Sequence, residues 1–110
     1  MPDQFIVVLI TAPSLEVGEQ IAAALLEQKL AACVNILPAI QSIYTWQGTV
    51  QNDREVLLVV KSRAALFAER LVPAVKAMHP YEVPEIIALP ILLGSQSYLD
   101  WIAAETTSID

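Results

Sequence analysis

The chain has 110 residues and a mass of 12.0 kDa, which suits one domain with a core of its own. Its net charge of −6, with six scattered Lys and Arg residues, argues against a nucleic-acid partner, because phosphate binding depends on clustered bases. Hydrophobic residues make up 55% of the chain and charged residues only 16%, so a small monomer would leave apolar surface in water.

Membrane insertion does not explain this apolar excess. A spanning helix needs about 20 consecutive apolar residues, and the longest apolar runs, residues 5–10 and 86–93, are far shorter. The N-terminus has no basic lead before a long apolar stretch, so no secretory signal is expected. We therefore expect the chain to pack against copies of itself. The single cysteine, Cys33, excludes an intrachain disulfide and fits a reducing cytoplasm.

The first predicted elements are a strand and a helix. Residues 5–10 form a continuous apolar run, which is typical of a strand buried on both faces. Apolar side chains then recur at helical spacing and predict a helix over residues 15–30. Ser14 is its expected N-cap, and Glu16 in the first turn suits the helix dipole.

A long β-hairpin is predicted next. Residues 31–37 have the composition of a strand, which Pro38 interrupts with a bulge or an edge position before it resumes over residues 40–47. Turn-forming residues fill positions 48–53, and residues 54–61 form the return strand. A hairpin of this length would project past a small domain, which again favours pairing between subunits.

The last part of the chain adds a helix, a strand and a terminal helix. Ser62 is the expected cap of the second helix, and Pro73 should kink or divide that helix. Residues 86–93 predict a fourth strand, and residues 98–105 a last helix. The tail, residues 106–110, is expected to fray.

The order of these elements predicts the fold class. It is βαββαβ followed by a helix, and right-handed crossovers then give a four-stranded antiparallel sheet with two helices on one face. This is an α+β fold, the ferredoxin-like plait. No linker divides the chain, so residues 1–110 are expected to form a single domain. Tyr44 and Trp46 on the hairpin favour packing between subunits.

Residues 79–86 are the stretch that core building does not explain. They hold the only histidine, two carboxylates, a tyrosine and two prolines, and the prolines should keep the segment extended. In a polyproline-type chain His79, Glu82 and Glu85 would follow one edge about 9 Å apart, whereas two ligands of one zinc-like ion lie within about 4 Å. A metal site therefore needs further ligands from elsewhere. The alternative is a rigid crossover whose polar groups face water.

Local motifs do not predict an enzyme. Cys33 and His79 could form a thiol-imidazole pair that acts as a nucleophile or as two metal ligands. The apolar surroundings of Cys33 favour an inert, buried thiol instead. The sequence contains no GxSxG, HExxH or Gly-rich phosphate loop. Lys61 and Arg63 follow a strand end and could attract an anion, although exposed bases at such turns are usually only solvated.

Several short segments, spread over nearly the whole chain, form a specific pattern when taken together. They are Thr11-Ala-Pro13, Leu30-Ala-Ala-Cys-Val-Asn35, Tyr44-x-Trp46-x-Gly48, Glu55 with Lys61, residues 79–86, and Gly94 followed by Tyr98-Leu-x-Trp101. With these segments the sequence resembles the CutA divalent-cation tolerance proteins. The resemblance implies a ferredoxin-like fold assembled through its sheets as a compact homotrimer, similar in architecture to PII signalling proteins.

The resemblance also implies a link to copper and other divalent metals. The first functional hypothesis is thus a non-enzymatic homotrimer that holds Cu(II) or another divalent cation weakly, with Cys33, His79 and Glu82 as the candidate ligands. His79 and Glu82 would meet Cys33 or a carboxylate across a subunit boundary. Some members of the family have a cysteine and a second histidine where this chain has Ile10 and Met78, so two good metal ligands are missing here.

The second hypothesis is a PII-like sensor. In it, the cleft between subunits holds a small anionic ligand near Lys61, Tyr81 and Glu85, because a stiff polar segment stands out in an otherwise apolar trimer. A third hypothesis is a purely structural or partner-binding trimer, and a thiol enzyme is the fourth. None of these hypotheses includes nucleic acid or a membrane as a partner.

Overall fold

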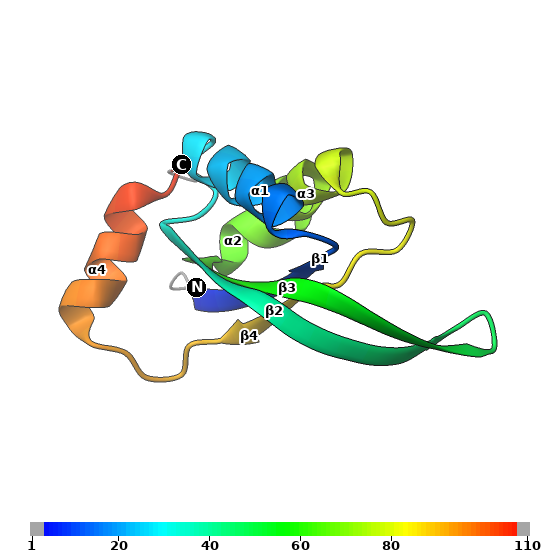
Figure 1. Ribbon diagram of the computed structural model, residues 1–110. Helices are drawn as coiled ribbons and strands as arrows, with labels where there is room; N and C mark the ends of the chain where they lie inside the picture. The colour runs from blue at the N-terminus through cyan, green and yellow to red at the C-terminus, as the bar shows by residue number, and fades with distance from the viewer. Residues whose placement is uncertain (1–3, 108–110) are drawn as a thin grey trace.

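The computed structural model describes residues 4–107. Its elements, in chain order, are β1 (Phe5–Ala12), α1 (Leu15–Glu27), β2 (Cys33–Trp46), β3 (Thr49–Arg63), α2 (Ala64–Leu66), the π-helical turn η1 (Phe67–Leu71), α3 (Val72–Met78), β4 (Ile86–Pro90) and α4 (Gln96–Glu105). The four strands form one antiparallel sheet in the order β2-β3-β1-β4. Helices α1 and α3 lie on one face of the sheet and α4 stands at one end (Figure 1). The α+β class and the predicted plait with its terminal helix are confirmed.

The sheet has a covered and an uncovered face. Val8 and Ile10 of β1 are fully buried under the helices with their β3 neighbours Val60 and Leu58. Leu9 points to the opposite face, as successive strand side chains do, and it is only half-buried. We predicted burial of β1 on both faces, but the side chains of Val7 and Leu9 on the second face are only half-buried. Most of that face is open in a single chain.

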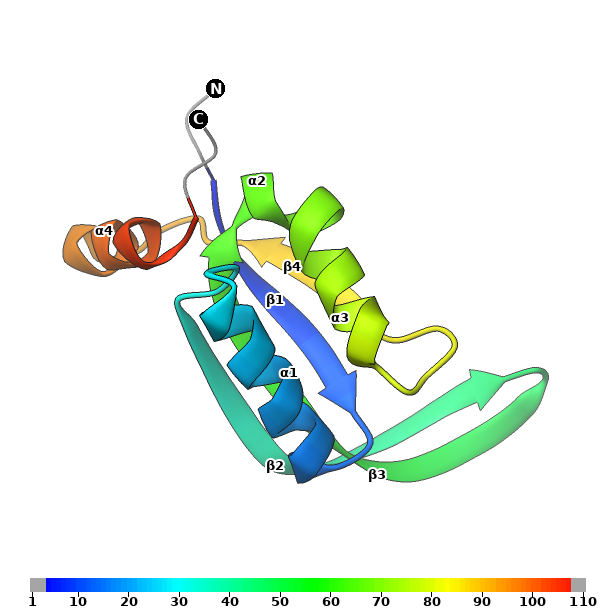
Figure 2. The same cartoon turned by 90° about the horizontal axis from the view of Figure 1, so that it is seen from above.

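The β2–β3 hairpin extends beyond the rest of the molecule (Figure 2), and with the hairpin included the chain is 44 Å long. Its turn consists of Gln47 and Gly48, both with positive φ (51° and 79°), as in the two-residue turns that suit hairpins. Of the turn predicted for residues 48–53, only Gly48 lies in the turn, because residues 49–53 belong to β3, which is exposed near the hairpin tip. The predicted irregularity at Pro38 is confirmed by a shift in register.

The second helix is divided, as Pro73 predicted. The π-helical turn η1 runs directly into α3, and Pro73 lies in the first turn of α3, so the residue that lacks an N–H falls at the junction of the two. Ser62 does not cap this helix. It is the fully buried penultimate residue of β3, and its hydroxyl donates to the Leu30 carbonyl at 2.6 Å. The N-cap position belongs to Arg63, which makes no side-chain capping bond.

Several predicted ends move by two or three residues. Helix α1 stops at Glu27 rather than at residue 30, because Lys29 adopts a positive φ of 57° that a helix does not continue. Strand β4 stops at Pro90, which has no N–H for the ladder. Helix α4 begins at Gln96. Among residues 4–107, no helix combines the length and the apolar character that crossing a bilayer requires.

The chain does not fray at the end of α4. Thr106 is buried, and its hydroxyl accepts a hydrogen bond from Nε of Arg63 at 2.8 Å. The backbone N–H of Thr107 donates to the Lys29 carbonyl, also at 2.8 Å. The predicted fraying is wrong for these two residues, because Thr106 is tied to β3 and Thr107 to the turn that follows α1. Residues 108–110 lie outside the described part of the chain.

Candidate functional site

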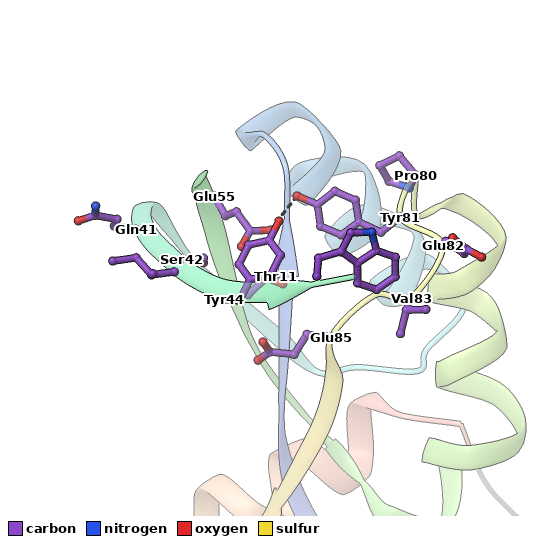
Figure 3. A pocket seen from close by; sticks show the side chains of 12 residues that line it. Thr11, Gln41, Ser42, Tyr44, Glu55, Pro80, Tyr81, Glu82, Val83 and Glu85 are labelled. Atoms are coloured by element: carbon purple, nitrogen blue, oxygen red, sulfur yellow. Dashed lines mark hydrogen bonds between the residues drawn. The ribbon is translucent and has the colours of Figure 1, made fainter. Parts of the chain in front are cut away.

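An open cleft of about 760 Å³ separates the β2–β3 hairpin from the loop that joins α3 to β4. Figure 3 shows the side chains that line it. The lining residues are Thr11, Gln41, Ser42, Ile43, Tyr44, Trp46, Glu55, Pro80, Tyr81, Glu82, Val83 and Glu85. The cleft therefore includes most of the stretch that the sequence singled out, opposite the exposed part of the hairpin.

His79 anchors the loop instead of facing the cleft. Its backbone is extended, as expected before Pro80, and its side chain is 8% exposed. The ring nitrogen Nε2 lies 2.7 Å from the Thr11 carbonyl, and Nδ1 lies 3.2 Å from the backbone N of Tyr81. Because a carbonyl only accepts, Nε2 carries the proton and Nδ1 accepts from Tyr81. Both nitrogens are thus engaged within the chain, so neither is available to a metal in this conformation.

Tyr81 ties the loop to the hairpin. Its hydroxyl donates to Oε2 of Glu55 at 2.8 Å, and its ring packs against the His79 ring at a centroid distance of 4.8 Å. Burial of the phenol and this hydrogen bond raise the pKa of Tyr81 well above its ordinary value. Glu55 is only 7% exposed. The loop is therefore fixed to β1 through His79 and to β3 through Tyr81.

The raised pKa of Tyr81 predicts that its phenol stays protonated in alkaline solution. At about pH 11, above the ordinary tyrosine pKa of about 10, Tyr81→Phe should show the same phenolate absorbance as the wild type. Because the pKa of Tyr81 is higher in the folded than in the unfolded state, the protonated phenol stabilises the fold fully below about pH 10. This contribution is lost as the pH rises through the folded-state pKa. Near-ultraviolet absorbance during alkaline titration measures this.

The control for this titration is Tyr44→Phe, which removes an exposed phenol. Its hydrogen bond to Asp53 raises the pKa of Tyr44 as well, but the ring is 40% exposed. We expect this variant to lose phenolate absorbance at a lower pH than Tyr81→Phe does. If the two variants lose absorbance at the same pH, Tyr81 is not shielded in the way that the structure indicates.

Electrostatically, the cleft favours cations. Glu55, Glu82 and Glu85 line it, while its lining contains no Lys or Arg. Its aromatic walls come from Tyr44, Trp46 and Tyr81. Sequence reasoning gave the two hairpin aromatics an interface role and gave Glu55 none. The alternation of side chains along β2 and β3 could have placed Tyr44, Trp46 and Glu55 on one face of the hairpin. It could not have shown that the α3–β4 loop completes the cleft.

Cys33 and Lys61 lie elsewhere. They are register neighbours on the uncovered face, where the Lys61 ammonium donates to Oδ1 of Asn35. Val7 is the β1 partner of Lys61 and stands four residues from Thr11, the contact of His79, which corresponds to about 13 Å along a strand. Within one chain the structure therefore does not bring Cys33 or Lys61 together with the residues of the cleft.

The Cys33 thiol is half-buried beside α4. Burial raises the pKa of Tyr98 on α4, and the nearby Cys33 thiol raises this pKa further. Glu82 and Glu85 are both exposed at the rim of the cleft. Across residues 4–107, no three His, Cys, Asp or Glu side chains are grouped so that they could hold one metal ion.

Comparison with known proteins identifies the family to which the chain is related. The family model described as "CutA1 divalent ion tolerance protein" matches residues 6–105. The Divalent-cation tolerance protein CutA of Thermus thermophilus is 57% identical over 100 residues, which cover 91% of this chain and 96% of that protein. Protein CutA, chloroplastic, of Arabidopsis thaliana is 50% identical over 101 residues, and these cover 92% of this chain but 55% of that longer protein.

Solved structures agree with this match. The structure of the divalent cation tolerance protein (Cut A1) from Thermus thermophilus superposes with a TM-score of 0.90 at 55% identity, covering 94% of this chain and 99% of that one. CutA1 from Oryza sativa superposes with a TM-score of 0.90 at 48% identity, covering 94% of each chain. The chain belongs to the CutA1 divalent ion tolerance protein family.

Proposed function

We propose that the protein is a cytoplasmic homotrimer that holds divalent cations weakly and catalyses no reaction. The uncovered face of the sheet supports the trimer. Leu9, Val59 and Ile87 are neighbours across three strands of that face, and Ile87 is 50% exposed. Apolar area of this kind on a soluble chain marks a contact surface. The free Cys33 thiol fits a reducing compartment.

The cation proposal rests on the acidic lining of the cleft, which contains no Lys or Arg. Glu82 and Glu85 at its rim offer carboxylate oxygens, the ligands that Mg²⁺, Ca²⁺ and Mn²⁺ prefer. The affinity should be low, because the described part of one chain supplies no complete ligand set. The remaining ligands would come from water or from a neighbouring subunit.

Copper is the metal that the resemblance names, and it would need a different arrangement. Cu(II) favours imidazole, and Cu(I) favours thiolates. His79 would have to give up its bond to Thr11 or to Tyr81, and Cys33 would have to come from another subunit. We therefore propose that the protein mainly binds divalent cations through the carboxylates at the rim of the cleft. Copper would bind only at a site formed between subunits.

Isothermal titration calorimetry with Mn(II) tests this proposal. The double variant Glu82→Gln/Glu85→Gln should lose the heat of binding that the wild type gives. The matched control is Glu16→Gln/Glu19→Gln, which removes the same charge from exposed positions of α1 and should behave as the wild type. Equal heats from both double variants would exclude the rim carboxylates. A copper heat that disappears in Cys33→Ser would reveal the site between subunits.

A small-molecule sensor is the second candidate function. The cleft volume of about 760 Å³ supports it, because ligand pockets commonly measure about 300–1,000 Å³ and have apolar and aromatic walls. An anionic ligand is not favoured by the lining, since Lys61 lies outside the cleft. A ligand present at 100 times its dissociation constant adds about 2.7 kcal/mol of stability, which a thermal-shift screen detects readily.

A further inference from the structure

Within residues 4–107, no basic side chain pairs with the carboxylate of Glu55. It is 7% exposed and lines the cleft, and its Oε2 accepts from the Tyr81 hydroxyl at 2.8 Å. Its other oxygen, Oε1, makes no hydrogen bond within residues 4–107 and is open to the solvent of the cleft, where a ligand can reach it. Burying a carboxylate is unfavourable unless a cation or several donors compensate it. One neutral phenol supplies only part of that compensation, so the site is suited to a ligand that donates hydrogen bonds and carries positive charge.

The walls around Glu55 are aromatic. Figure 3 shows the rings of Tyr44 and Tyr81 beside this carboxylate. Trp46 lines the same cleft. The face of an aromatic ring attracts an ammonium group, and the attraction is strongest where water is excluded. A carboxylate surrounded by aromatic rings therefore favours an organic ammonium over a hydrated metal ion, which needs several oxygen ligands at once.

The size of the cleft also favours an organic molecule. About 760 Å³ is far more space than a metal ion fills. We propose that the cleft binds an organic ammonium compound, with its charged nitrogen at Glu55 and its apolar body between the hairpin aromatics and Tyr81. This inference rests on the small-molecule function proposed above and names the class of its ligand. It is independent of the Mn(II) site at Glu82 and Glu85.

Three probes of matched shape test the charge requirement. Benzylammonium, benzyl alcohol and benzoate share a ring and differ in charge at the same position. Trp46 fluorescence reports binding in the variant Trp101→Phe, because the chain has only two tryptophans and Trp101 lies on α4. Benzylammonium should change the fluorescence saturably. Benzyl alcohol and benzoate should bind at least about tenfold more weakly, as expected when a charge-assisted hydrogen bond is lost.

The outcomes separate the ligand class from the function. Equal binding of benzyl alcohol, or tighter binding of benzoate, would overturn the ammonium class while leaving a small-molecule cleft in place. A flat response to all three probes would overturn both. This comparison uses one protein, so it does not depend on the folding of any cleft variant.

A pair of variants then tests whether the carboxylate of Glu55 is the group that attracts the ammonium. Glu55→Gln removes the charge but keeps an oxygen that can accept from Tyr81, and it should weaken benzylammonium binding by about tenfold or more. Asp100→Asn is the matched control, because it removes the same charge from the exposed side of α4. If both variants weaken binding equally, the attraction comes from net charge and the proposed site is wrong.

Discussion

Leu9→Glu is expected to reduce the assembled particle to the mass of one 12.0 kDa chain. Leu9 lies at the centre of the uncovered face, between Val59 of β3 and Ile87 of β4. In a trimer built through this face the new carboxylate would be buried three times, once per subunit, and its direct neighbours in the sheet, Val59 and Ile87, are both apolar. The effective penalty for each buried ion is several kcal/mol, which is enough to abolish association at micromolar concentration.

Multi-angle light scattering at a fixed protomer concentration measures this effect. The matched control is Ala23→Glu, which adds the same charge to an exposed position of α1 and should leave the mass unchanged. The helix-facing side of β1 is untouched by Leu9→Glu, because Val8 and Ile10 point the other way. A variant that keeps the wild-type mass would show that the trimer does not form through this face.

The fold could be predicted from the sequence because its signals are local. Pro38 marks the change in register of β2, and Pro73 marks the division of the second helix. The hairpin turn could not be placed, since a polar run such as residues 49–53 looks the same in a turn and in a strand with both faces in water. Ser62 resembled a helix cap because a serine before a helical pattern looks the same whether its hydroxyl caps that helix or bonds to a distant residue. Its true partner, the Leu30 carbonyl, is 32 residues away.

The site was harder to predict than the fold. Residues 79–86 do contribute to the cleft, yet the roles of their side chains depend on contacts that no local pattern shows. The partner of His79 is the Thr11 carbonyl, 68 residues earlier, and the partner of Tyr81 is Glu55, 26 residues earlier. Cys33 was a reasonable candidate by chemistry alone. Only the strand register shows that it lies far along the sheet from His79.

His79→Ala is expected to lower the free energy of unfolding by about 2–4 kcal/mol. The truncation leaves the Thr11 carbonyl and the Tyr81 N–H without their partner in a buried place, and each unsatisfied buried group costs about 1–3 kcal/mol. Urea denaturation at a fixed protomer concentration measures the loss, because the stability of an oligomer depends on concentration. His79 therefore positions the loop of the cleft and is not itself a metal ligand.

Two further variants distinguish positioning from metal binding. His79→Gln retains an amide that can donate to the Thr11 carbonyl, so it should recover part of the lost stability. Lys76→Ala, at an exposed position in the last turn of α3, should change the free energy of unfolding by less than about 0.5 kcal/mol. A His79→Ala protein with wild-type stability and no heat of copper binding would reverse the assignment. Stability would then not depend on the two hydrogen bonds, and the imidazole would be a metal ligand.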